Sequence, residues 1–285
     1  MSKPIFFVIL AMAVTSLACG FSVTLPGGVS VTPGATVTDA IDIPIPDARG
    51  VSLSLNFGAG EMFLAPGAEG ALVSGSATYN LPEFKPILRV EGGVVEIRQD
   101  NFRTGGMPKL DGLINTWDLK LGRTPMDLTI QAGAYDGEFE FGGLALTSLT
   151  IKDGASDVKL RFSEPNQTQM SLLRYETGAS NVTLYRLGNA NLTSLNFTGG
   201  AGNYTLDFNG DLQRDAAITL ESGVSNVTLI IPQNITVKMT VEAGLTNVSV
   251  PSDWTQNGNT YTQTGEGPTL TFVIKMGAGN LNITR

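Results

Sequence analysis

Apolar and polar residues alternate along most of the chain, in short runs centred on a recurring glycine. Around Gly178, apolar residues stand five and three positions before the glycine, at Leu173 and Tyr175, and four and six positions after it, at Val182 and Leu184. A period of two predicts strands that bury one face. Each unit is therefore expected to be a strand, a bend at the glycine and a second strand.

The glycine column gives the length of the unit. Successive glycines from Gly133 to Gly244 are 21, 24, 22, 23 and 21 residues apart, so the unit has about 22 residues. We expect glycine here because the bend requires a positive φ or brings neighbouring turns close together. The next residue is usually alanine, and the bend is expected to place its side chain inside. The column consists of Gly58, Gly133, Gly154, Gly178, Gly200, Gly223, Gly244 and Gly277.

A polar residue stands three positions after each glycine. Asparagine tolerates left-handed backbone and can bond to its own turn, and stacked asparagines can form an amide ladder. We interpret the column as structural, and it accounts for four of the nine Asn-x-Ser/Thr sequons of the chain. The column consists of Asp136, Asp157, Asn181, Asn203, Asn226, Asn247 and Asn280, with Glu61 in the copy at Gly58.

One such unit cannot bury its apolar face alone, but a stack of units can. The sequence therefore predicts an all-β repeat architecture of about 22-residue strand–bend–strand units in the form of a β-solenoid. An antiparallel β meander is the alternative. The interval from Gly244 to Gly277 is 33 residues long and contains the hairpin turn signal Asn257-Gly258. Because repeat arrays need capped ends, we expect this hairpin to cover the last unit.

The amino terminus is typical of a secretory signal. One lysine precedes a run of ten apolar residues, which is too short to span a bilayer. The letters SLAC at residues 16–19 resemble a bacterial lipobox, although Ser16 and Leu17 stand where that pattern has leucine and a small residue. Cleavage before Cys19 would allow lipidation there and anchor the protein to the cell membrane on its extracytoplasmic side. An ordinary cleaved signal peptide, and hence secretion, is the alternative.

Four segments are predicted along the chain. They are a signal peptide at residues 1–18, a lipid-anchored tether at 19–49, a small N-terminal β subdomain at 50–112 and the β-repeat domain at 113–285. The tether is inferred from a segment rich in Thr, Val, Pro and Gly without clear periodicity. An extra edge strand near Val23–Leu25 or Ile41–Ile45 is the alternative, and residues 100–112 are expected to form a polar loop.

Composition excludes several classes of function. The net charge is −8 and no basic run is present, so no nucleic-acid partner is expected. The chain has no histidine, which excludes histidine acid–base catalysis, Ser-His-Asp triads and histidine metal sites. The single cysteine excludes intrachain disulfides and multi-cysteine metal clusters. No cofactor and no metal are predicted.

One pattern mimics a calcium loop. Asp207, Asn209 and Asp211 match its first three ligand positions, but Leu212 replaces the expected glycine and Ile218 the final glutamate. A polar turn between units is therefore favoured.

Stacking would also bring carboxylates together, as in a polysaccharide lyase or hydrolase. A solvated face is the favoured interpretation of these residues. Trp254 and Tyr261 could stack on a sugar, but pairing across their hairpin is favoured. The charged candidates are Asp136 with Asp157, Glu138 with Glu140, and the nearby Lys159 and Arg161.

Two segments resemble a known family. They are GAGEMFLAPGAEGALVSGSATYNL at residues 58–81 and INTWDLKLGRTPMDLTIQAGAYDGEFEF at residues 114–141. They look like the toast-rack domain proteins of bacterial envelopes, which are similar to the carboxyl-terminal domain of LiaF-type envelope-stress regulators. The resemblance covers roughly residues 50–285, and it implies an extracytoplasmic β-repeat domain with no assigned activity and no catalytic residues to carry over. LiaF-type regulators have membrane helices before this domain and this sequence shows none, so direct regulation of a membrane kinase is not implied.

The sequence therefore predicts a non-enzymatic, surface-anchored extracytoplasmic protein that serves as an envelope scaffold or binding module. A sensor or partner in cell-envelope stress signalling is the alternative that the resemblance suggests. A carbohydrate-active β-solenoid enzyme is the third hypothesis. The expected partners are the membrane, through the lipid anchor, and another envelope protein or a cell-wall glycan.

Overall fold

The computed structural model describes residues 33–99 and 112–285. The predicted signal peptide, Cys19, the edge strand considered at Val23–Leu25 and nearly all of the polar loop lie outside these ranges. Within them, no helix combines the length and apolar character that a bilayer span requires.

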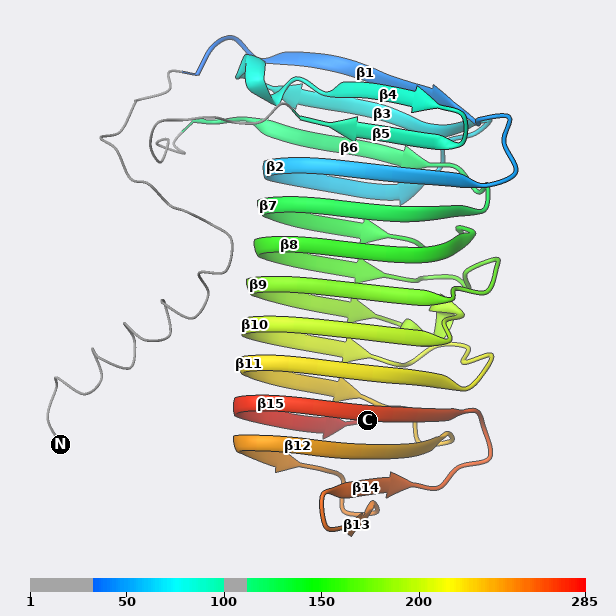
Figure 1. The fold of residues 1–285 in the computed structure, drawn as a ribbon, viewed down its shortest axis with the longest axis vertical. Helices are drawn as coiled ribbons and strands as arrows, with labels where there is room; N and C mark the ends of the chain where they lie inside the picture. The colour runs from blue at the N-terminus through cyan, green and yellow to red at the C-terminus, as the bar shows by residue number, and fades with distance from the viewer. Residues whose placement is uncertain (1–32, 100–111) are drawn as a thin grey trace, which may run out of the picture. The chain divides into compact units, whose positions relative to one another are not determined.

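Eight long strands form the body of the described protein. Each runs along one layer, bends near its central glycine and returns along a second layer, and Figure 1 shows the two halves as a front ribbon and an arrow behind it. We call each long strand a rung, and its halves before and after the glycine the first and second arm. The rungs are β2 (Val51–Pro66), β7 (Met126–Glu140), β8 (Leu146–Arg161), β9 (Leu172–Tyr185), β10 (Ser194–Asp207), β11 (Ala216–Ile230), β12 (Thr236–Ser249) and β15 (Thr269–Thr284).

Neighbouring rungs pair in parallel, with equivalent columns in register. Leu195 of β10 faces Leu173 of β9 on one side and Ile218 of β11 on the other. The predicted β-solenoid is confirmed. The meander is wrong for the rungs, because a meander would pair them antiparallel.

The order of the rungs departs from the order of the sequence at one place. β15 lies between β11 and β12, so that Ile274 of β15 faces Leu220 on one side and Val241 on the other. After β12 the chain forms the hairpin β13 (Thr255–Asn257) and β14 (Thr260–Gln263), and then returns between the two earlier rungs. β14 pairs antiparallel with the first arm of β12. The predicted hairpin therefore covers the last rung of the stack, which is β12.

At the other end, shorter strands continue each layer separately. β6 (Asn115–Leu121) pairs with the second arm of β2, followed by β3 (Ala71–Tyr79) and β1 (Val37–Pro44). β5 (Val94–Arg98) pairs with the first arm of β2, followed by β4 (Ile87–Glu91). A short 3₁₀ helix, η1 (Pro82–Phe84), lies between β3 and β4.

The segment predicted as a tether contains a strand at residues 37–44. They form β1, with Ile41 and Ile43 buried, as in the edge-strand alternative. The alternation of apolar and polar residues in VTDAIDIP explains why this segment pairs as a strand. The sheet also runs without a break across residue 112, because β2 and β6, which lie on either side of the proposed boundary, pair directly with each other.

A single core lies between the two layers. Inward-facing residues of both arms are almost fully buried along the stack, except in the second arm of β12, and the largest include Trp117, Tyr175 and Tyr204. The aromatic rings pack against one another, with centroids 5.4 Å apart for Tyr175 and Phe197 and 4.9 Å apart for Phe197 and Tyr204. This continuous burial is what a single unit could not provide.

The alternation of inward-facing and outward-facing residues is interrupted once in each rung, at the bend. The residues one before and two after the glycine face the core, as Thr177 and Ser180 do, whereas the glycine and the residue after it face outward. The expectation that the small apolar residue points inside is therefore wrong, since Val224 is 64% exposed and Leu245 is 87% exposed. The outer side of a corner carries two consecutive residues, and the period of two resumes on each arm.

Candidate functional site

The glycine column is a ladder of close backbone contacts. A β-carbon on Gly200 would lie 2.5 Å from the carbonyl oxygen of Gly178, and each rung from β7 onward shows such an approach of less than 3.0 Å to its neighbour's glycine. No glycine of the column is among the described residues with positive φ. Of the two reasons expected for glycine at the bend, the close approach of neighbouring turns is the one that applies.

The polar column contains an amide ladder. The Nδ2 atom of Asn203 donates to Oδ1 of Asn181 at 2.9 Å, Asn226 donates to Asn203 at 3.1 Å, and Asn280 donates to Asn226 at 2.7 Å. Asn247 stands in register beside Asn280 at the end of this ladder. These side chains are exposed, so the ladder lies on the outer face of the second arms.

The acidic members of the same column stack at the other end. Glu61, Asp136 and Asp157 occupy neighbouring rungs in register. Among the described residues, no group of three or more acids, cysteines or histidines is arranged to hold a metal ion.

A cluster of buried tyrosines around one half-buried carboxylate, which sequence reasoning missed, lies inside the bend. The hydroxyls of Tyr135 and Tyr175 both donate to Oδ2 of Asp153, at 3.3 and 2.8 Å. Burial, with the charges of Tyr135 and Asp153, raises the pKa of Tyr175 well above that of a free tyrosine. Burial and Asp153 raise the pKa of Tyr204 to about 12. The available signal was Asp153 itself, a charge placed directly before a column glycine.

A groove of about 560 Å³ marks the outer face of the second arms near β2. Here charged and aromatic side chains stand where the later rungs have outward-facing threonines, such as Thr183 and Thr205. They come from five strands: β6, β2, β7, β8 and β9. The charged residues are Asp118, Lys120, Glu138, Glu140, Lys159 and Arg161, and the aromatic ones include Phe63 and Tyr185.

Several charges of the groove already have partners. Lys120 forms an ion pair with Asp118 at 3.1 Å. One carboxylate oxygen of Glu140 accepts from the backbone N–H groups of Gly142 and Ser163, at 2.7 and 3.0 Å. Glu140 therefore fixes the loops that follow β7 and β8.

Two cations of the groove remain available. The guanidinium of Arg161 lies 4.6 Å from the centroid of the Tyr185 ring, in a cation–π contact. Lys159 stands between Glu138 and Thr183 in the register of the sheet. Neither Lys159 nor Arg161 forms an ion pair among the residues that the structure describes.

The carboxylates considered for catalysis therefore come together only as neighbours on one exposed face. Asp136 and Asp157 face each other on adjacent rungs, and Glu138 faces Lys159. Glycoside hydrolysis uses two carboxylates that flank the scissile bond from opposite sides. Glu140, bound to two backbone N–H groups, is a structural residue.

The calcium-like stretch forms a turn. One oxygen of Asp207 accepts from the backbone N–H of Asn209 at 2.9 Å, and the backbone N–H of Asp211 donates to Oδ1 of Asn189 at 2.8 Å. Asn189 is itself buried and donates to the carbonyl of Phe162 at 2.8 Å. These residues connect successive loops, and Asp207 and Asp211 do not converge on a common point.

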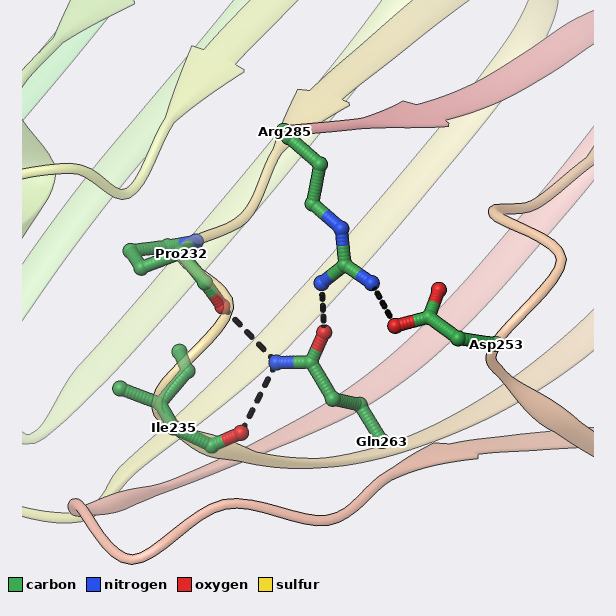
Figure 2. Close-up of polar contacts among 5 residues, drawn as sticks. All are labelled: Pro232, Ile235, Asp253, Gln263 and Arg285. Carbon is green, nitrogen blue, oxygen red and sulfur yellow. Dashed lines mark hydrogen bonds and ion pairs between the residues drawn. The ribbon is translucent and has the colours of Figure 1, made fainter.

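The aromatic pair of the last hairpin is buried. Trp254 is 8% exposed and Tyr261 is 9% exposed, so stacking on a sugar is wrong for both. Tyr261 pairs with Gln256 across β13 and β14. Figure 2 shows how the hairpin is held: Gln263 donates to the carbonyls of Pro232 and Ile235 at 2.8 and 2.9 Å.

Arg285 completes this arrangement. In Figure 2, the guanidinium of Arg285 reaches both Gln263 of the hairpin and Asp253 before it. Arg285, which directly follows the inserted rung β15, thus contacts the cap of the stack.

The sequence matches the model of a known protein family. The model of the N-terminal domain of toast_rack, DUF2154, matches residues 32–185 and again residues 165–230. The chain belongs to this family. The two matches of the toast_rack domain overlap, as expected when one structural unit repeats along a chain. The resemblance noted from the sequence is confirmed.

Solved structures give weaker similarities. A "putative cell adhesion protein" from Clostridium sporogenes is 21% identical, covers 88% of this chain and 99% of its own, and has a TM-score of 0.49. A "putative adhesin" from Bacteroides fragilis is 10% identical, covers 89% and 100%, and has a TM-score of 0.43. At these scores the similarities carry no argument about this chain. No curated protein matches the sequence.

Proposed function

We propose that this toast-rack protein is a non-enzymatic, lipid-anchored extracytoplasmic module that binds an acidic cell-wall glycan. The observation that carries the proposal is the pair of available cations in the groove, Lys159 and Arg161, beside the ring of Tyr185. Anchoring is inferred from Cys19 and the signal-like segment before it.

The chemistry of the groove favours an anionic ligand with an apolar face. Arginine presents a planar fork that matches carboxylate and phosphate groups, and its stacking on Tyr185 restricts the orientation of that fork. Phe63 adds apolar surface on the β2 side of the groove. Because all of these side chains stand on paired strands, the groove is held rigid before the ligand arrives.

The two backbone hydrogen bonds that Glu140 accepts support a groove that binds a ligand without catalysis. Both backbone N–H donors bind the same carboxylate oxygen of Glu140, so this oxygen holds the loops in place and is not available to a ligand. The signalling alternative rests on the family resemblance alone.

The test measures binding of the purified protein to isolated cell-wall sacculi that retain their anionic polymers. Substituting both groove cations, Lys159→Gln with Arg161→Gln, is expected to weaken binding by about tenfold or more, because charged hydrogen bonds contribute about 1.5–3 kcal/mol each. The matched control, Lys152→Gln with Lys238→Gln, removes the same charge from the first arms and is expected to bind as the unmodified protein does.

Two results would contradict the proposal. Equal loss of binding in both double variants would show a general charge effect without a role for the groove. Release of soluble sugar fragments from the sacculi, abolished by Glu138→Gln, would establish the carbohydrate-active alternative.

A further inference from the structure

One small side chain leaves space in the groove on the second arms. Outward-facing residues near the ends of these arms and of β6 form a row across five strands, and every one of them except Ala65 has a long side chain. Ala65 is half-buried, and it pairs in register with Lys120. The row consists of Lys120 of β6, Ala65 of β2, Glu140 of β7, Arg161 of β8 and Tyr185 of β9.

The neighbour of Ala65 on β7 is held by the loops. One carboxylate oxygen of Glu140 accepts from the backbone N–H groups of Gly142 and Ser163, which lie in the loops after β7 and β8. The floor of the groove on the β2 side is therefore the methyl group of Ala65. Phe63, two residues earlier on the same face of β2, borders this floor with its ring.

Long side chains stand on both sides of this floor. On β6, Lys120 forms its ion pair with Asp118 at 3.1 Å. On β8, the guanidinium of Arg161 lies 4.6 Å from the centroid of the Tyr185 ring. The strands β2 and β7 lie between β6 and β8, so the backbones of the two sides are three strand spacings, or about 14 Å, apart. This width accommodates a ring-shaped group between the two sides.

The charges at the two ends of the groove have opposite signs. Toward the bend, Glu61, Asp136 and Asp157 stack in register, and no cation pairs with them in the part of the chain that the structure describes. Toward the loops stands Arg161, with Lys159 two residues before it on the same face. An anionic group is therefore attracted to the loop end and repelled from the bend end.

We propose that Ala65 determines which ligands the groove accepts. A sugar ring of the glycan lies over the methyl group of Ala65 and against the ring of Phe63, and an anionic substituent of the glycan binds Arg161. This inference rests on the proposed glycan binding, and it adds the position of the ring and the direction of the charge.

The arrangement combines the two kinds of contact that small-ligand sites use. Apolar and aromatic surface buries the body of a ligand, and a few placed polar groups fix its orientation. Ala65 and Phe63 supply the first kind of contact, and Arg161 supplies the second. A longer side chain at position 65 would occupy the place of the ring while leaving every charge of the groove unchanged. Ala65 is thus a specificity-determining residue.

Filling this space tests the inference. Ala65→Gln adds bulk without charge and is expected to weaken binding of the purified protein to isolated sacculi by about tenfold or more, because the ring loses its contact surface. There are two matched controls. Ala65→Ser changes the size of the side chain little, and Thr205→Gln places the same bulk on the same outer face, two rungs beyond β8. Both are expected to bind as the unmodified protein does, and melting temperatures check that all three variants are folded.

The salt dependence of binding separates a steric effect from an electrostatic one. Ala65→Gln retains Lys159 and Arg161, so added salt is expected to weaken its binding by the same factor as that of the unmodified protein. The double variant Lys159→Gln with Arg161→Gln lacks these cations, and its remaining binding is expected to depend less on salt. An altered salt dependence of Ala65→Gln would show that the substitution disturbs the cations, and it would contradict a steric role for position 65.

Two further results would overturn this inference and leave the proposed function intact. Binding of Ala65→Gln as tight as that of the unmodified protein would show that no ring lies over position 65. Equal loss of binding in Ala65→Gln and Ala65→Ser would show that the size of the side chain is not what matters there. Failure of the unmodified protein to bind sacculi would instead contradict the proposed function, and this inference with it.

Discussion

Gly200 leaves no room for a β-carbon, because that atom would lie 2.5 Å from the carbonyl oxygen of Gly178 on the neighbouring rung. The obstacle is backbone, which cannot rotate away as a flexible side chain can. Gly200→Ala is therefore expected to lower the free energy of unfolding by about 1–3 kcal/mol, the usual cost of overpacking. Urea denaturation followed by circular dichroism measures the change.

The control for this substitution is the next residue. Ala201 faces outward, so Ala201→Ser is expected to change the free energy of unfolding by less than about 0.5 kcal/mol. Equal stability of the two variants would show that the close approach of the turns is not what requires glycine.

Asn203 both donates to Asn181 and accepts from Asn226 in the amide ladder. Asn203→Ala removes both hydrogen bonds and is expected to destabilise the protein by about 1 kcal/mol. Thr205→Ala, two residues along the same outward face, is the matched control and is expected to have a smaller effect. Equal melting temperatures of the two variants would show that the ladder adds no measurable stability.

The buried tyrosines predict a loss of stability at alkaline pH. Burial raises the pKa values of Tyr135 and Tyr175 above those in the unfolded chain, so folding favours the protonated hydroxyls. Their contribution is complete below the unfolded pKa of about 10 and is lost as the pH rises from there toward the folded pKa. The two tyrosines should therefore leave the melting temperature unchanged from pH 7 to 9 and lower it above pH 10.

Tyr175→Phe removes one of the titrating groups. Its melting temperature is expected to fall less steeply above pH 10 than that of the unmodified protein, whatever the variant's stability at neutral pH. Parallel curves for the two proteins would contradict a contribution from this hydroxyl.

Gln263 is the central contact of the cap. Gln263→Leu would leave the carbonyls of Pro232 and Ile235 without their donor, at a cost of about 1–3 kcal/mol. Hydrogen exchange should show faster opening of β13 and β14 while the middle rungs stay protected, because repeats contact only their neighbours. Arg285→Gln is expected to have the milder effect, since Asp253 is exposed. Uniform loss of protection along the stack would contradict a local cap.

The local pattern of the sequence was sufficient to predict the rungs. Period-two alternation marks both arms, and a glycine at fixed spacing marks each bend, so Leu173 and Val182 could be assigned to the core before any pairing was known. The same period does not say which residues of a corner turn outward, and so the direction of Ala201 was predicted incorrectly.

Features that depend on pairing between distant segments were not predictable. The apolar columns of β11, β12 and β15 are interchangeable, and Ile274 can face Leu220 or Val241 equally well, so the pattern does not reveal that β15 enters between two earlier rungs. The groove shows the same limit. Lys159 and Arg161 were noted from one strand, whereas Lys120 and Tyr185 join them only through the register of the sheet.

The most direct test of the proposed role is the intact mass of the mature protein purified from its own membranes, with Cys19→Ala as the control. A surface-anchored module predicts a mature chain that begins at Cys19 and carries the added mass of a lipid, and it predicts loss of that mass in the control. An unlipidated mature chain, or protein found in the medium, would contradict the anchor and indicate a secreted protein.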